Sequence, residues 1–72
     1  MPVISQIQIQ LNGVEHLVTS GSTIAVLLRE LKIENRYCAV ERNSNVVPRE
    51  QHAVCVLQSG DQIEVVTLVG GG

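Results

Sequence analysis

The chain has 72 residues, of which 44% are hydrophobic and 17% charged, and its formal net charge is −2 at pH 7. A chain of this size forms at most one domain and leaves little room for an enclosed catalytic pocket, which argues against an enzyme that acts alone. Its cations are scattered and Tyr37 is its one aromatic residue. The basic stripe and stacking platforms of a nucleic-acid-binding protein are therefore lacking.

Signals for membrane insertion or secretion are lacking as well. The longest apolar runs, residues 24–28 and 53–57, are too short to span a bilayer. Residues 1–10 lack the cationic start and the apolar stretch of a signal peptide. Cys38 and Cys55 form neither a CxxC motif nor a disulfide framework. We therefore expect a cytoplasmic protein whose reduced cysteines behave as small buried hydrophobes.

The first segment predicts a β-hairpin. Hydrophobic and glutamine residues alternate over residues 6–11, which predicts a half-buried strand with the odd-numbered side chains inward. Asn12 and Gly13 follow, and these residue types favour the positive φ angles of a type I′ turn. In the return strand, residues 14–19, we expect the even-numbered side chains to face inward and Leu17 to face outward.

The next segment changes to the period of a helix. Four residues share the spacing of one apolar helix face: Ile24, Leu27, Leu28 and Leu31. Ser22 or Thr23 can cap this helix by accepting a hydrogen bond from a backbone N–H of its first turn.

The second half of the chain predicts two more strands, residues 37–43 and the last strand from residue 62. Between them we expect a turn at residues 43–45, a short helical turn that starts at Pro48, and either a buried strand or a packed loop at residues 53–57.

The last strand follows a turn at residues 59–61. Its alternation places Ile63 and Val65 inward, and it places Glu64, Val66 and Leu68 outward.

The order of elements predicts an α+β fold in which one main helix packs across a mixed sheet. The first and last strands are apolar enough to lie centrally, and the helical connection between them permits parallel pairing. This is a β-grasp (ubiquitin-like) arrangement. We expect one β-grasp domain over residues 1–68 and a flexible, glycine-rich C-terminal tail over residues 69–72.

Side chains that could carry chemistry are few. His16 and His52 have no ligand partners at metal-binding spacing, so we expect His16 at a strand edge, His52 on the surface, and no metal site. Neither Cys38 nor Cys55 has a neighbour in the sequence that would lower the pKa of its thiol. We therefore predict no catalytic residue in this chain.

The sequence closes with Gly70, Gly71 and Gly72. Glycine has no Cβ, so such a segment can thread a channel too narrow for other residues. Four residues beyond Leu68 reach about 13 Å when extended. A terminal carboxylate, with a pKa near 3.5, is a poor acyl electrophile until a partner activates it. We predict that Gly72 is an acyl handle and that Gly70 and Gly71 thread it into a partner's active site.

Several of these features together resemble the ThiS family of bacterial sulfur carriers. They are the Asn-Gly turn, the segment "NSNVVPREQ" at residues 43–51, the segment "SGDQIEVV" at residues 59–66, and the terminal glycines. The resemblance covers nearly the whole chain, from about Ile7 to Gly72.

The resemblance implies a route for sulfur. An E1-like adenylyltransferase (ThiF-type) would use ATP and Mg²⁺ to adenylate the Gly72 carboxylate. A cysteine-desulfurase relay would then supply persulfide sulfur to form a thiocarboxylate, which a thiazole synthase (ThiG-type) would use in thiamine biosynthesis. Docking would involve Val66 and Leu68.

Two alternatives stay open from the sequence. One is a carrier like the small subunit of molybdopterin synthase, although that family tends to have prolines before its terminal glycines, where this chain has Thr67, Leu68 and Val69. The other is a ubiquitin-like protein modifier or a plain interaction module.

Overall fold

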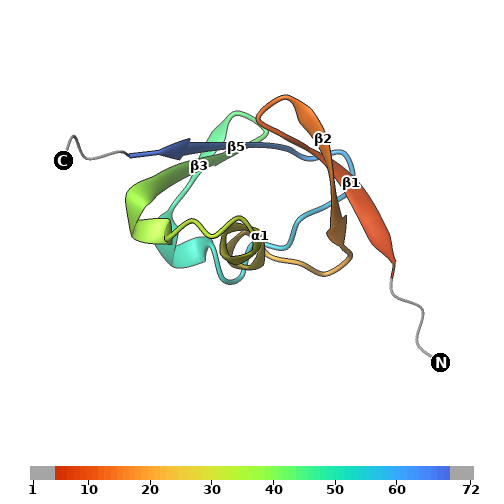
Figure 1. Cartoon of the computed structure of the whole chain (residues 1–72), viewed down its shortest axis with the longest axis horizontal. Coiled ribbons are helices and arrows are strands. Elements are labelled where there is room, and N and C mark those ends of the chain that lie inside the picture. The colour runs from red at the N-terminus through yellow and green to blue at the C-terminus, as the bar shows by residue number, and fades with distance from the viewer. Residues whose placement is uncertain (1–4, 69–72) are drawn as a thin grey trace.

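The computed structural model describes residues 5–68. Its strands form one sheet in the order β2-β1-β5-β3-β4, and α1 packs across one face of this sheet (Figure 1). The strands are β1 (Gln6–Leu11), β2 (Val14–Thr19), β3 (Cys38–Arg42), β4 (Asn45–Val47) and β5 (Gln62–Thr67). The helical segments are α1 (Ile24–Glu30) and two 3₁₀ helices, η1 (Asn35–Tyr37) and η2 (Arg49–Gln51). The predicted α+β, β-grasp arrangement is confirmed.

The β1–β2 hairpin has the predicted turn. Asn12 and Gly13 have φ angles of 50° and 81°, the pair of positive values that a type I′ turn requires. On β2, Val18 is buried and Leu17 is 57% exposed, as the alternation predicts. Val14 is 67% exposed, and the inward placement expected for it is wrong. Val14 lies next to the turn, at the end of the hairpin.

The first and last strands lie side by side at the centre of the sheet. β1 and β5 run parallel, with Leu11 opposite Ile63. Since a parallel pair needs a crossover, the segment that contains α1 and the β3–β4 hairpin makes this connection. β5 then ends on the side of the molecule opposite to the start of β1 (Figure 1).

Helix α1 covers the inner face of the sheet. Thr23 caps it, since its hydroxyl oxygen accepts a hydrogen bond of 3.2 Å from the backbone N–H of Val26. The predicted stripe is buried at Ile24, Leu27 and Leu28, while Leu31 is half-buried at the C-terminal end of the helix. The core contains Ile9, Val18, Ile24, Leu27, Leu28, Cys38, Val40, Leu57, Ile63 and Val65.

The β3–β4 hairpin differs from the sequence prediction. Asn43 and Ser44 both have positive φ, 51° and 72°, so the turn is two residues long and Asn45 already belongs to β4. Strand β4 has only three residues, too few for a visible alternation, and it pairs with β3 through Val40 and Val47.

His52 is buried, so the prediction of a surface histidine is wrong. It is 2% exposed, and its Nε2 lies 3.2 Å from the carbonyl oxygen of Val47. The segment that follows is a packed loop, in which Leu57 is buried and Val56 forms a single β-bridge with Thr23. Within residues 5–68, no helix has the length and hydrophobicity needed to cross a bilayer.

Candidate functional site

The candidate site is built on the outward face of β5. Ile63 and Val65 point into the core and are 1% and 8% exposed. Between and after them, Glu64, Val66 and Leu68 are exposed on the other face, as predicted. Val66 and Leu68, the expected docking residues, are 55% and 54% exposed. The structure therefore presents apolar side chains at the base of the tail.

Residues from β3 and η1 extend this apolar surface. Ala39 lies opposite Val66 in the β3–β5 pairing. The backbone N–H of Leu68 donates a 2.6 Å hydrogen bond to the carbonyl oxygen of Tyr37. Tyr37 is 51% exposed, and the guanidinium of Arg36 lies 4.8 Å from the centre of its ring. We call Tyr37, Ala39, Val66 and Leu68 the β5 patch.

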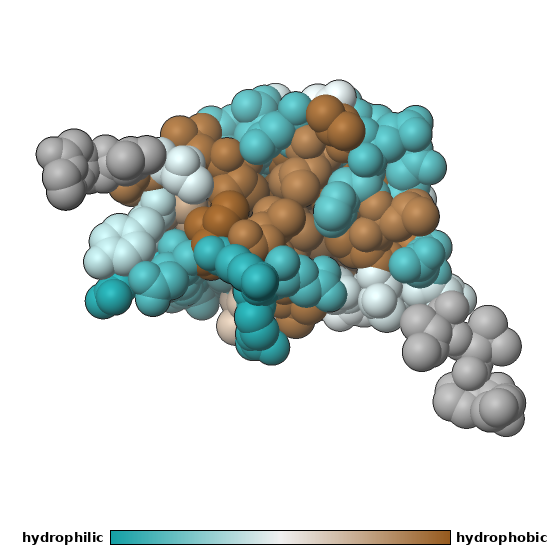
Figure 2. Space-filling model, in the orientation of Figure 1, coloured by the Kyte–Doolittle hydropathy of each residue, from teal (hydrophilic) through white to brown (hydrophobic). Residues whose placement is uncertain are grey.

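Hydrophobic side chains are prominent on the surface more widely. Figure 2 shows them as a broad band across the face that it presents, extending toward the end of β5, with polar side chains above and below. Several exposed apolar residues are typical of protein surfaces, but a contiguous group beside a predicted reactive tail favours a protein-binding role.

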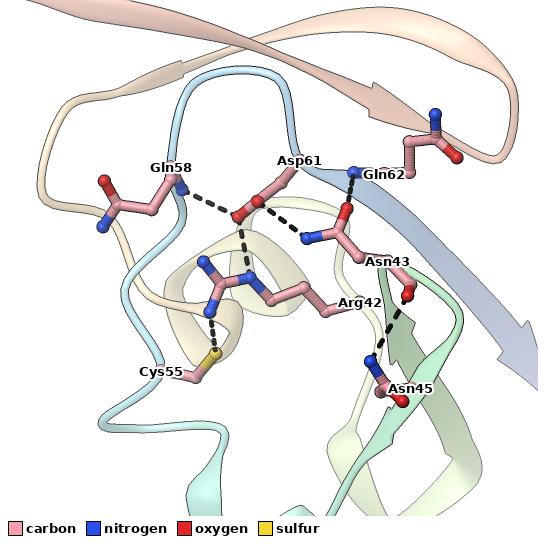
Figure 3. Close-up of polar contacts among 7 residues, drawn as sticks. All are labelled: Arg42, Asn43, Asn45, Cys55, Gln58, Asp61 and Gln62. Carbon is pink, nitrogen blue, oxygen red and sulfur yellow. Dashed lines mark hydrogen bonds and ion pairs between the residues drawn. The ribbon is translucent and has the colours of Figure 1, made fainter.

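A polar cluster holds the opposite end of β5 (Figure 3). Asp61 is 6% exposed and forms an ion pair with Arg42, with 2.9 Å between Oδ2 and Nε. Its carboxylate also accepts hydrogen bonds from the Asn43 side-chain amide, at 3.1 Å, and from the backbone N–H of Gln58, at 2.8 Å. The side-chain oxygen of Asn43 (Oδ1) accepts a hydrogen bond from the backbone N–H of Gln62 at 2.9 Å. These contacts tie the start of β5 to the β3–β4 turn.

Asn12 supports the middle of β5. Its side-chain oxygen accepts a 2.8 Å hydrogen bond from the backbone N–H of Val65, and its side-chain nitrogen lies 3.3 Å from the Val65 carbonyl oxygen. β1 pairs with β5 only at Gln10 and Leu11. Beyond these two pairs, the Asn12 side chain takes the place of β1 and provides hydrogen-bond partners for the backbone N–H and C=O of Val65.

The two cysteines are both free. Cys38 is buried, and burial raises the pKa of its thiol, although the charge of Arg49 acts in the opposite direction. Cys55 is half-buried, with its sulfur 3.5 Å from Nη1 of Arg42. The pKa of the neighbouring Arg42 guanidinium is raised: burial alone would lower it, but the hydrogen bond and the negative charge of Asp61 have the larger, opposite effect. Cys38 therefore resembles a core residue and not an activated nucleophile.

Metal-ligating side chains are not gathered in the described part of the chain. Within residues 5–68, no group of three or more His, Cys, Asp or Glu residues could hold a metal ion. His16 is half-buried on β2, an edge strand, as predicted.

The predicted acyl site lies outside the described residues. Gly70, Gly71 and Gly72 all follow Leu68, the last residue that the structure describes. Their expected roles therefore stay predictions, while the surface that leads to them is described.

Sequence reasoning assigned Asn12 and Asp61 to turns and missed their side-chain roles. Asn and Asp side chains commonly form hydrogen bonds with backbone groups in turns, so the residue types alone indicate that such bonds are possible. The partners Val65 and Arg42 are distant in sequence and could not be seen. The place of Tyr37 in the β5 patch was missed because its neighbours there, Val66 and Leu68, are brought beside it only by the pairing of β3 with β5.

Comparison with known proteins decides the family. The model of the ThiS family matches residues 4–72 of the chain. The chain belongs to the ThiS family. It is 35% identical to the sulfur carrier protein ThiS of Escherichia coli over 65 residues, which cover 90% of this chain and 98% of that protein.

Two further relatives place this result in context. A thiazole synthase of Paramagnetospirillum magneticum is 39% identical over 62 residues, but this chain spans only 19% of that protein's length. The crystal structure of the thiamine biosynthesis protein ThiS from Geobacter metallireducens superimposes with a TM-score of 0.78 at 29% identity. The superposition covers 92% of this chain and all of the other. The ThiS-family chain therefore has the β-grasp fold of a solved family member.

Proposed function

We propose that this protein is a sulfur carrier of thiamine biosynthesis and that the carboxylate of Gly72 carries the sulfur. The observation that supports this most directly is its similarity to a ThiS sulfur carrier over nearly the full length of both chains. In this proposal the carrier has no catalytic side chain of its own, and its partners supply the chemistry.

Sulfur would be loaded in two stages. An E1-like adenylyltransferase would bind ATP and Mg²⁺, and a Gly72 carboxylate oxygen would attack the α-phosphate and release pyrophosphate. The terminal sulfur of a persulfide, supplied by a cysteine-desulfurase relay, would displace AMP to give an acyl disulfide. A second thiol would attack the S–S bond, releasing the Gly72 thiocarboxylate and forming a disulfide. The acyl carbon is activated first because a free carboxylate does not react with a thiol at neutral pH.

A thiazole synthase is the proposed acceptor of the sulfur. Support comes from the thiazole synthase relative, in which about a fifth of the length resembles this chain. A carrier-like stretch within a synthase is expected if the two proteins must meet during the reaction. The same relationship favours the thiazole pathway over the molybdopterin pathway.

The β5 patch would be the docking surface for the activating partner. Val66 is exposed on β5, where the strand pairs with β3, and Leu68 is exposed directly after the strand, held by its backbone hydrogen bond to Tyr37. A rigid strand that leads into a glycine segment can present one terminal group at a fixed point in a partner's active site.

Intact-mass measurement tests the proposal. Protein made together with its native partners should contain a fraction in which one oxygen atom is replaced by sulfur, located on Gly72 by fragmentation. The measurement also determines whether Gly72 is the last residue of the mature chain, as the proposal requires. A ubiquitin-like modifier would instead give covalent adducts of the chain with other proteins.

Deletion of Gly72 gives the matched control. The shortened chain should keep its unfolding midpoint but should not support ATP–pyrophosphate exchange by the adenylyltransferase from the same organism. Normal exchange with the shortened chain would refute Gly72 as the acyl site.

A further inference from the structure

Two glutamates are cross-strand neighbours on the outer side of the sheet. Glu41 on β3 lies directly opposite Glu64 on β5. The next pair in this register, Val40 and Val65, is buried in the core. Because side chains alternate along a strand, both glutamates point away from α1. Like charges that are directly opposite in neighbouring strands destabilise a sheet.

The protein does not neutralise this pair within its described residues. In residues 5–68 the ion pairs are Arg36 with Glu34 and Arg42 with Asp61. Neither involves Glu41 or Glu64.

The outer face of the sheet as a whole is acidic. The strands contain three glutamates, Glu15, Glu41 and Glu64, and a single cation, Arg42, which is paired with Asp61. The four other cations lie outside the strands, on α1, η1, η2 or the loop between α1 and η1: Arg29, Lys32, Arg36 and Arg49. The net negative charge of the chain is therefore concentrated on the sheet.

This acidic pair is continuous with the β5 patch. Ala39 and Val66 form the adjacent outward pair, two residues further toward the tail on β5. Two residues of a strand span about 7 Å, so one partner surface can contact both rows at once. Val46, which is 69% exposed, lies opposite Glu41 on its other side.

A hollow beside Glu64, on the side of β5 that faces β1, could receive the stem of a long side chain that reaches Glu64. Its volume is about 330 Å³, and Gln10, Gly13, Gln62, Ile63 and Glu64 line it. The glutamine amides and the Glu64 carboxylate are hydrogen-bond acceptors of the kind that a guanidinium or ammonium group requires.

We propose that Glu41 and Glu64 recognise an arginine or lysine side chain of the activating adenylyltransferase, whose apolar side chains pack on the β5 patch. The inference rests on the proposed function and names the chemistry of the partner's surface. A cation between the two carboxylates removes their mutual repulsion, and exclusion of water by the surrounding apolar contact strengthens its attraction to them. The repulsion in the free carrier thus favours the bound state.

The test compares two double variants that change the net charge equally. Glu41→Gln with Glu64→Gln removes the acidic pair, whereas Glu30→Gln with Glu50→Gln removes two exposed carboxylates from α1 and η2. The purified adenylyltransferase from the same organism is the probe. The measurements are KM and kcat for the carrier in ATP–pyrophosphate exchange, at low and high salt, and the Tm of each free carrier.

For the variant of the acidic pair we expect KM to rise about tenfold at low salt with kcat unchanged, and the difference to shrink at high salt. Its Tm should rise by about 1–5 °C, because the like-charge repulsion is gone. The control variant should change KM by less than about twofold. Weaker binding together with a more stable free protein is the combination that a merely structural role would not produce.

Each other outcome overturns the inference. Equal KM values for the two double variants, or a lower Tm for the variant of the acidic pair, would show that the pair is not a recognition site. If the wild-type carrier supports exchange and gains sulfur while its KM does not depend on Glu41 and Glu64, only this inference fails. If the wild-type carrier supports no exchange, the proposed function fails and the inference fails with it.

Discussion

The two ends of β5 are built differently. At its start, Asp61 is buried and bonded to Arg42, Asn43 and Gln58. At its other end, the strand is held by backbone pairing with β3, and Val66 and Leu68 are exposed. The first end uses side chains for stability and the second leaves them available for contact. A carrier needs both, because a partner can position a tail accurately only if the strand before it does not move.

The largest expected effect is at the start of β5. Asp61→Asn removes the negative charge opposite Arg42. It also replaces one carboxylate oxygen by an NH₂ group, which would then face a donor that the carboxylate accepts from, such as Arg42 Nε or the Gln58 N–H. We expect a loss of about 2–4 kcal/mol of the free energy of unfolding, since an unpaired, partly buried charge is left behind. A domain of this size has only about 3–5 kcal/mol from its core. Urea unfolding should therefore show a much lower midpoint.

Glu50→Gln, which makes the same change of charge at an exposed site on η2, is the control for Asp61→Asn. Its midpoint should stay close to that of the wild type. Equal midpoints for the two variants would mean that the polar cluster does not anchor β5.

An intermediate effect is expected at Asn12. This residue lies in the β1–β2 turn, and its side chain makes two contacts with the backbone of Val65 in the middle of β5. Asn12→Gly keeps the ease of positive φ and loses the side-chain contacts, so it should cost about 1 kcal/mol of unfolding free energy. Asn12→Ala also forces a left-handed conformation on alanine and should cost about 1 kcal/mol more. Urea unfolding of both variants separates the two contributions. Equal stability of the two variants would assign the whole effect to the side-chain contacts.

The smallest effect on stability is expected at the open end. Val66→Ser should change the unfolding free energy by less than about 0.5 kcal/mol, because the side chain is largely exposed. In exchange assays with the adenylyltransferase, however, KM should rise about fivefold, equivalent to about 1 kcal/mol of lost contact. Val54→Ser, at a 74% exposed position in the loop after η2, should leave both quantities unchanged. A similar rise in KM for both variants would remove the β5 patch from the docking surface.

Much of the fold could be predicted because its signals are local. The alternation in residues 6–11, the Asn12-Gly13 turn and the apolar stripe of α1 each depend on neighbours within a few positions. The central, parallel placement of β1 and β5 followed from their hydrophobicity and from the connection between them. Two features were missed for different reasons. Strand β4 has only three residues, too few to show an alternation. The burial of His52 depends on a distant element, α1, where the backbone N–H of Ala25 donates a hydrogen bond to the His52 carbonyl oxygen.

The site divides in the same way. The outward direction of Val66 and Leu68 could be predicted from the alternation along β5. That Glu41 lies opposite Glu64 could not, because it depends on the register between two strands separated by the β4 hairpin and the loop after η2. A shift of one residue would have turned one of these carboxylates toward the core.

The central place of β5 has a consequence for the order of folding. The β1–β2 and β3–β4 hairpins can each form from nearby residues, but only β5 joins them into one sheet. Among residues 5–68, β5 is also the last strand, so these long-range pairings must wait until it has been synthesised. A truncated translation product that lacks β5 would leave two unconnected hairpins. Every molecule that completes the sheet therefore contains the strand that leads to the terminal glycines.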